Sequence, residues 1–314
     1  MKTDSPQSDV STPRSQYPLG STDAEHERLI RQAVRLNALT ERLFRVAGMG
    51  RGQRVLEIGS GVGDVAMLAG GLVGPEGEVV GIERDGRSIA RARARVAEAG
   101  FTNVSFTQCD VSQISVDELF DAVVGRFILG FLPDAADVLR SLTRLVRPGG
   151  IVAFHEASHA PFLALSSHLP LWFASASLAG EIVQRSGANT EMGPALHDVF
   201  QEAGLPAPTM HLEMVLGREP DFTRWTYDLL CSLRPQSEQV GLSLETLGDF
   251  DTLLARLQSE VADSNTVVPW VALVGAWSRK PTMNLTDAAH TLERERRLPN
   301  GLSRRRAPDD GANH

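Results

Sequence analysis

The segment VLEIGSGVGD, residues 55–64, has a glycine spacing that suits a ligand-binding loop. Three glycines occupy alternate positions, Gly59, Gly61 and Gly63. A carboxylate lies on either side of them, Glu57 before the first and Asp64 after the last. Glycines let a ligand approach the backbone closely, which a Cβ atom would prevent. Two neighbouring carboxylates would repel a pyrophosphate, whereas they would favour a ligand that carries an ammonium group. The segment therefore predicts a site for a cationic small molecule.

The same loop also satisfies a dinucleotide-binding pattern. Residues 61–66, GVGDVA, match G-x-G-x-x-A, which in a strand–loop–helix unit holds a pyrophosphate at the N-terminus of the helix. A nicotinamide or flavin enzyme is therefore an alternative that the glycines alone leave open.

Carboxylates also follow the next two predicted strands. Glu83 ends the apolar run GEVVGIE, about twenty residues past the loop, where an acidic side chain can bind both hydroxyls of a ribose. Asp110 ends NVSFTQCD, where it can accept a hydrogen bond from an adenine amino group. We therefore assign both acids to a cofactor site, together with the adjacent residues Ser60, Arg84 and Val111.

The elements that must position these residues alternate along the chain. Residues 23–48 carry apolar side chains near helical spacing and end at Gly48, and five apolar runs then alternate with helical segments. Strands separated by helices indicate a parallel sheet with helices on both faces, which is an α/β doubly wound fold. The five predicted strands are RVLEI, GEVVGIE, NVSFTQCD, FDAVVGRFILG and IVAFHE.

Downstream of the fifth strand the pattern changes. We predict helical insertions at about 157–190 and 220–262, with a sixth strand, TMHLEMVLG, between them and a last strand, VVPWVALVGAWSR, after them. Such insertions would form a helical cap over the carboxyl ends of the sheet, where open α/β sheets bind ligands. Residues 1–15 and 281–314 are polar or charged without an apolar period, and we predict that they are disordered.

Composition limits the class of protein. The chain has 314 residues, a formal net charge of -8 and two cysteines that form no CxxC pair. These values argue against a wide nucleic-acid surface, a zinc cluster and a disulfide framework. Residues 1–20 lack the apolar core of a secretory signal, and serines interrupt the most apolar run, residues 162–180, which favours a cap helix over a membrane span. We predict a soluble, cytoplasmic protein.

Residues 53–156 resemble a class I S-adenosylmethionine-dependent methyltransferase. The glycine motif, Glu83, Asp110, FDAVV and RPGG have the order and spacing of that family, and the opening YPLGSTDAEHERL resembles small-molecule methyltransferases of quinone and secondary-metabolite pathways. The resemblance implies S-adenosylmethionine as cofactor and a seven-stranded Rossmann-like sheet of order 3-2-1-4-5-7-6, with the seventh strand antiparallel. It also implies that residues 16–280 form one methyltransferase domain, into which the helical cap segments are inserted.

The resemblance implies roles for individual residues as well. In the family the loop wraps the methionine part of the cofactor, so Glu57 and Asp64 would lie near its cationic α-amino group. Arg126 and Phe127 follow the fourth strand, where the family lines the sulfonium region, and Tyr17 lies in a segment that closes over the cofactor. The alternatives are structural: a turn cap for Glu57 or Asp110, a surface acid for Glu83, ordinary core for Phe127 and a mobile-arm contact for Tyr17.

The end of the fifth strand, AFHEASH, offers candidate bases. Methyl transfer mainly requires alignment of the acceptor and exclusion of water, and a base is needed only where the acceptor must lose a proton. We predict His155 and Glu156 as catalytic residues, with His155 first because an imidazole titrates near neutral pH, and His159 as a substrate-binding residue. The alternatives are that His155 bonds to backbone and that Glu156 caps the loop.

The nature of the acceptor is predicted from the cap. All four tryptophans lie after residue 170, and we assign Trp172, Trp225 and Trp270 to the substrate site. Aromatic cap residues suit a flat or partly apolar small molecule, although they also suit the cap's own core. The segment VVGRFILG lacks the carboxylates of metal-dependent catechol methylation, so no metal is predicted. No nucleic-acid or membrane partner is expected, and no pattern indicates an oligomeric state.

The sequence thus predicts methyl transfer from S-adenosylmethionine to a small, partly apolar or aromatic acceptor in secondary metabolism. Two alternatives stay open. One is an NAD(P)-dependent oxidoreductase, and the other is a non-catalytic cofactor-binding protein that kept the loop and lost its chemistry.

Overall fold

Seven strands form one mixed sheet in the computed structural model, which describes residues 19–114 and 117–282. The strand order is β3-β2-β1-β4-β5-β9-β6. Neighbours among the first five strands are parallel, and β9 runs antiparallel to both β5 and β6. With β9 counted as the seventh strand, the predicted fold class and order are confirmed. The strands are β1 (Arg54–Ile58), β2 (Glu78–Glu83), β3 (Val104–Gln108), β4 (Phe120–Arg126), β5 (Val146–Ser158), β6 (Thr209–Glu213) and β9 (Ala272–Arg279).

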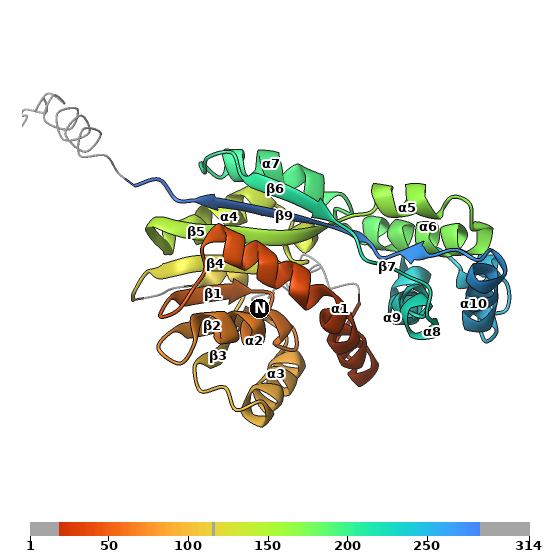
Figure 1. Cartoon of the computed structure of the whole chain (residues 1–314), viewed down its shortest axis with the longest axis horizontal. Coiled ribbons are helices and arrows are strands. Elements are labelled where there is room, and N and C mark those ends of the chain that lie inside the picture. The colour runs from red at the N-terminus through yellow and green to blue at the C-terminus, as the bar shows by residue number, and fades with distance from the viewer. Residues whose placement is uncertain (1–18, 115–116, 283–314) are drawn as a thin grey trace, which may run out of the picture. The chain divides into compact units, whose positions relative to one another are not determined.

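Helices cover both faces of the sheet, because successive strand residues point into two different apolar cores. Val55 and Ala153 belong to the core beneath α1, α2 and α3, whereas Leu56 and Phe154 belong to the core beneath α4 and α7. Figure 1 shows these two layers on either side of the strands. The helices are α1 (Asp23–Ala47), α2 (Asp64–Val73), α3 (Gly86–Glu98), α4 (Ala135–Arg144) and α7 (Met192–Glu202).

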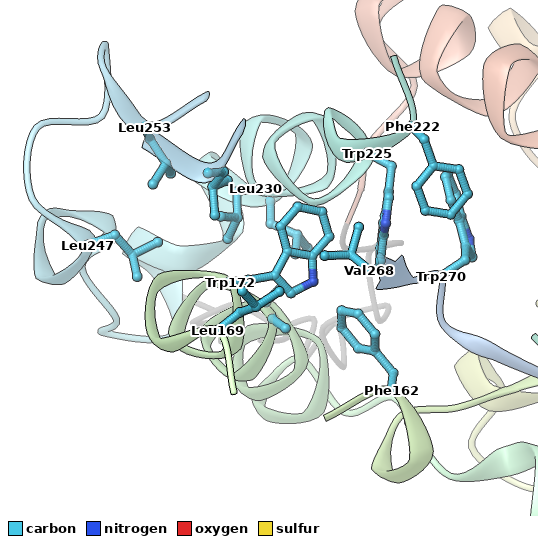
Figure 2. Packing of buried hydrophobic residues seen from close by; sticks show 14 of the residues in the cluster. Phe162, Leu169, Trp172, Phe222, Trp225, Leu230, Leu247, Leu253, Val268 and Trp270 are labelled. Carbon is cyan, nitrogen blue, oxygen red and sulfur yellow. The ribbon is translucent and has the colours of Figure 1, made fainter. Parts of the chain in front are cut away.

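The remaining helices form a cap with an apolar core of its own. Figure 1 shows them gathered at one end of the strands, and Figure 2 shows the indoles of Trp172 and Trp225 packed beside Phe162 within that core. Leu36 of α1 belongs to the same core, so α1 contacts both the sheet and the cap. The cap elements are α5 (Ala160–Ser166), α6 (Pro170–Arg185), α8 (Pro220–Thr223), α9 (Trp225–Gln239), the short helix η3 (Leu244–Leu247) and α10 (Leu253–Asp263).

The segment TMHLEMVLG, predicted as one strand, is divided in the structure. β6 ends at Glu213, and β7 (Leu216–Gly217) pairs instead with β8 (Val268–Pro269) in a separate two-stranded ribbon. Met214 and Val215 pack against the cap core, so the chain leaves the sheet after Glu213. Burial in the cap therefore outweighs the period-two pattern that predicted a longer strand.

None of the helices in the described part of the chain combines the length and the apolar composition that a membrane-spanning helix requires. The apolar run at 162–180 is divided between α5 and α6, and Pro170 stands at the start of α6. Tyr17 and the predicted disordered segment 1–15 lie outside the described residues, as does all but the first two positions of 281–314.

Candidate active site

A cavity of about 1130 Å³ opens where the strands end beneath the cap. Its walls include the glycine loop after β1, the ends of β2, β4 and β5, the first half of α1, and residues of α6 and α9. One cavity therefore joins the predicted cofactor loop to two of the predicted cap tryptophans, Trp225 and Trp270.

The glycine loop needs glycine for its backbone and for its close contacts. Gly59, Gly61 and Gly63 all have positive φ angles, of 69°, 50° and 88°. A Cβ atom on Gly59 would lie 2.7 Å from Ile128 Cδ1, whereas a Cβ atom on Gly61 would meet no heavy atom within 4 Å. Gly61 thus leaves open space at the cavity wall, which a ligand can occupy against bare backbone. α2 begins at once with Asp64.

Glu57 is a buried carboxylate with an unused oxygen. The residue is 1% exposed, and its Oε2 has no hydrogen-bond partner among the described residues. Burial raises the pKa of Glu57 to about 8, although a hydrogen bond with Ser60 opposes this rise. Because a buried charged acceptor without a donor is costly, a donor that reaches Oε2 would stabilise the ionised form of Glu57.

Asp64 lines the cavity and is also paired within the protein. Its carboxylate pairs with Arg95 of α3 at 2.7 Å, and Arg95 also donates to the Val62 carbonyl in the glycine loop. Both side chains are mostly buried. The negative charge of Asp64 is therefore already balanced by Arg95, whereas Glu57 has an oxygen that no described residue bonds to.

Glu83 and Asp110 line the cavity and also organise the loops that carry them. Glu83 Oε2 accepts from Gly61 N at 2.9 Å, and its Oε1 accepts from Arg84 N and Asp85 N. Asp110 Oδ1 accepts from the backbone and the hydroxyl of Ser112, so it caps the short helix η1 (Val111–Gln113). The capping alternative for Asp110 is thus present in the structure, together with a place in the cavity wall. Ser60, Arg84 and Val111 also line the cavity.

Arg126 ends β4 and Phe127 follows it, and both line the cavity wall. Arg126 donates to Asn37 Oδ1 at 3.1 Å and to Thr40 Oγ1 at 3.0 Å, and burial lowers its pKa to about 10. Phe127 has φ 55°, an uncommon angle for a residue with a bulky side chain. Its N–H donates to the His155 carbonyl at 3.0 Å, which helps to hold this strained turn.

The two predicted catalytic residues lie on opposite faces of β5. His155 points toward α1, where its Nδ1 lies 3.1 Å from Thr40 Oγ1, and it is not part of the cavity wall. Burial lowers the pKa of His155 to about 3. The prediction that β5 delivers both residues to the cleft is therefore wrong for His155, because adjacent strand residues alternate between the faces.

Glu156 does reach the cavity, but its carboxylate is engaged. Oε1 accepts from Ile128 N and Leu129 N at 2.9 Å each, and Oε2 lies 3.5 Å from Gly130 N. These donors belong to the start of η2 (Leu129–Phe131), which follows β4. Burial raises the pKa of Glu156 to about 7 against these hydrogen bonds. The arrangement matches the loop-capping alternative.

Aromatic side chains and small residues line the cap side of the cavity. His159, Phe162, Trp225 and Trp270 line it, together with Ala176, Ala179 and Gly180 of α6. Trp225 stacks on Trp270, with ring centroids 4.5 Å apart. Figure 2 shows both side chains in the cap core. Trp172 is fully buried edge-on against Trp225 and lines no part of the cavity, so the structure places it in the cap core rather than in the substrate site.

Several wall residues were not singled out from the sequence. Arg31 of α1 pairs with Asp228 of α9 at 3.0 Å, which connects the two elements across the cavity rim. Gly130 and Asn189 also line the wall. The local sequence feature near Arg31 is the helix-start pattern Thr22-x-x-Glu25, and its N-cap hydrogen bond is present. Such a pattern locates the start of α1 but does not predict which residues of the helix line a cavity. The described residues contain no group of three or more His, Cys, Asp or Glu side chains arranged to hold a metal ion.

Comparison with known proteins identifies the family. A family model described as a methyltransferase domain matches residues 50–204. The chain is 31% identical over 180 residues to the ubiquinone/menaquinone biosynthesis C-methyltransferase UbiE of Pseudomonas fluorescens, covering 53% of this chain and 70% of that enzyme. The chain belongs to the class I S-adenosylmethionine-dependent methyltransferases. Its cofactor is accordingly S-adenosylmethionine, which sets the nicotinamide alternative aside.

Other relatives define how far the likeness extends. The chain is 35% identical over 118 residues to the arsenite methyltransferase of Halobacterium salinarum. The aligned segment covers 37% of this chain but only 30% of that enzyme's length. The crystal structure of a methyltransferase from Bacillus halodurans covers 77% of this chain and 98% of its own, with a TM-score of 0.52 and 18% identity. At that identity the structural likeness shows the fold alone.

The cavity of this methyltransferase fits its cofactor by observations that do not depend on the relatives. The unpartnered Glu57 oxygen suits the α-amino group, and the open face of Gly61 suits close approach of the methionine chain. Glu83 and Asp110 line the same cavity at the ends of the next two strands.

Proposed function

We propose that this methyltransferase acts on a small, partly aromatic molecule bound in the cap half of the cavity, in secondary metabolism, in the cytoplasm and without a metal. The observation that carries the proposal is the single cavity, which has the glycine loop at one end and Phe162, Trp225 and Trp270 at the other. The name of the Pseudomonas relative, a quinone-pathway C-methyltransferase, supports a flat acceptor of this kind.

The protein's own contribution would be binding, alignment and exclusion of water. The bound cofactor supplies a methyl group on an activated sulfonium. Glu57 would balance the α-amino charge, Glu83 would bind the ribose hydroxyls, and Asp110 would accept from the adenine amino group. Glu83 would have to keep Gly61 N or exchange it for the ribose, since the two compete for Oε2.

The cap would align the acceptor. The stacked Trp225 and Trp270 offer a flat apolar wall, and Ala176, Ala179 and Gly180 leave room opposite. Holding an acceptor in line with the methyl group, away from water, is the main requirement of this reaction.

Two measurements test the proposal. Calorimetry should show saturable binding of S-adenosylmethionine and S-adenosylhomocysteine and none of NAD. Mass spectrometry after incubation with S-adenosylmethionine and a panel of phenols, hydroquinones and amines should show a singly methylated product from an aromatic member. Turnover only with acceptors that lack an aromatic or apolar group, or only with polymers such as nucleic acid, would contradict the proposed acceptor class.

A further inference from the structure

His159 is held rigidly in the cavity wall by three elements. It follows β5 directly, and its N–H donates to Glu191 Oε1 at 2.8 Å. Its ring lies edge-on to Phe162 of α5, with centroids 5.3 Å apart. The ring also lies against α6 at Gly180, where an added Cβ would come within 2.4 Å of Nε2. A ring fixed from three sides can present one nitrogen in a constant direction.

The hydrogen bonds of His159 define its tautomer. Nε2 lies 3.1 Å from the Ala176 carbonyl, which can only accept, so Nε2 carries the hydrogen. Nδ1 then carries a lone pair. No protein group in the described ranges, 19–114 and 117–282, bonds to Nδ1, and the residue is partly exposed in the cavity wall. Within the described residues, His159 Nδ1 is therefore a hydrogen-bond acceptor without a protein donor, on a residue of the cavity wall.

The charged surroundings of His159 are simple. Glu191, just before α7, is the carboxylate that acts on it, and that carboxylate already accepts from Ser158 Oγ, His159 N and Ala160 N. α5 and α6 present Phe162, Ala176 and Gly180 to the ring. Burial lowers the pKa of His159, while the Ala176 carbonyl and Glu191 oppose the change. Burial therefore favours the neutral imidazole over the imidazolium.

We propose that His159 Nδ1 accepts the proton of an acidic O–H on the methyl acceptor, so that the acceptor is a phenol or hydroquinone. This inference rests on the proposed function. The acceptor oxygen forms its bond to the methyl carbon as the sulfur–methyl bond breaks, and the electrons of that bond go to sulfur, which becomes a neutral thioether. The phenolic proton moves to Nδ1, and the imidazolium later releases it to water.

The other candidate bases are less suited to this step. His155 is outside the cavity wall, and the Glu156 carboxylate is occupied by backbone donors of η2. Among the three residues predicted from AFHEASH, His159 is the one that combines a place in the cavity wall with a ring nitrogen that no described residue donates to. It was predicted to contact substrate, and the proposal gives it a catalytic role.

A matched pair of ligands tests the hydrogen bond. Binding of 1-naphthol and of 1-methoxynaphthalene, which lacks the O–H, is measured by calorimetry on the full chain saturated with S-adenosylhomocysteine. Wild type should prefer 1-naphthol by roughly tenfold, as one neutral hydrogen bond predicts. The preference should vanish in His159→Phe and persist in His197→Phe, a control at an exposed histidine of α7. Equal preferences in wild type and His159→Phe, or no preference in wild type, would overturn the proposal.

Turnover and protonation test the proton transfer. With 1-naphthol as acceptor, His159→Phe and His159→Gln should each lower kcat by about 10²–10⁴, with KM for S-adenosylmethionine unchanged. The loss should shrink as pH rises, because the naphthol then ionises without help; a loss equal at every pH would indicate positioning alone and sink the base. Nitrogen-15 NMR should show His159 as the Nε2–H tautomer, and an Nδ1–H signal would contradict it. Failure to methylate 1-naphthol and every other phenol and hydroquinone of the panel, despite cofactor binding, would exclude the phenol class. Failure to bind S-adenosylhomocysteine would instead refute the proposed function.

Discussion

At the scale of single residues, Glu57 couples cofactor binding to pH. Its pKa in the ligand-free protein is about 8, so it is largely protonated at pH 7, whereas an ammonium ligand requires the ionised form. Affinity for S-adenosylhomocysteine should therefore rise from pH 6 to pH 8, with proton release that makes the calorimetric enthalpy depend on the buffer. Glu57→Gln should bind more weakly and lose this pH dependence. A wild-type affinity that is flat over this range would contradict the assignment.

The same residue should lower the stability of the ligand-free protein. An unfolded Glu57 ionises near its ordinary pKa of 4.5, whereas the folded one ionises near 8, so the unfolded state binds fewer protons between these values. The contribution of Glu57 to the free energy of unfolding is thus highest below pH 4.5 and falls as pH rises toward 8. Glu57→Gln should raise Tm by several degrees at pH 8 and by less at pH 5, as measured by calorimetry without ligand. A Tm lowered at pH 8 would refute this.

Glu83 should bind the ribose, at a cost to the loop when it is lost. A charge-assisted bond to two hydroxyls is worth roughly 1.5–3 kcal/mol, so Glu83→Ala should weaken S-adenosylhomocysteine binding by about 10- to 150-fold. Part of the loss would come from Gly61 N, which loses its partner. Glu83→Gln keeps an acceptor for Gly61 N and separates the two effects. Unchanged affinity in both variants would remove Glu83 from the site.

At the scale of elements, Glu156 fastens the turn between β4 and η2 to β5. Glu156→Ala would leave buried N–H groups at residues 128 and 129 without their acceptor, and should lower the free energy of unfolding by roughly 2–4 kcal/mol. Glu156→Gln retains a carbonyl acceptor and should keep turnover within about tenfold of wild type at every pH. Denaturant unfolding and pH profiles of both variants check this. A large, pH-dependent loss in Glu156→Gln would restore Glu156 as a base.

At the scale of the whole molecule, the cavity depends on α1, which contacts both the sheet and the cap. The Asp228 carboxylate of α9 receives Arg31 from α1 and Arg224 from its own helix. Asp228→Asn should weaken acceptor binding and lower stability by about 0.5–1 kcal/mol, whereas Asp137→Asn, which removes an exposed ion pair with Arg140 on α4, should change neither.

Saturating S-adenosylhomocysteine at 100 times Kd should stabilise the wild type by about 2.7 kcal/mol in a single unfolding transition. Separate transitions for sheet and cap would contradict this coupling.

The fold and the cofactor loop were determined by local sequence features. Apolar periods define the strands and helices and indicate a parallel, doubly wound sheet. The order of its strands was implied by the resemblance to class I methyltransferases. The positive φ angles at residues 59, 61 and 63 agree with the glycines there, because backbone conformation at a single residue is a local property. The carboxylates at the ends of β1, β2 and β3 followed from the strand assignment itself.

Only the tertiary structure decided how those side chains are used. A shift of one position along β5 separates His155, which faces α1, from Glu156, which faces the cavity, and sequence spacing does not say which face is which. Asp64 is neutralised by Arg95 from another helix, and Trp172 is enclosed by cap helices far away in sequence. His159 became the candidate base because α6 supplies the Ala176 carbonyl that fixes its tautomer. Partners of this kind come from distant segments, and packing rather than local pattern brings them together.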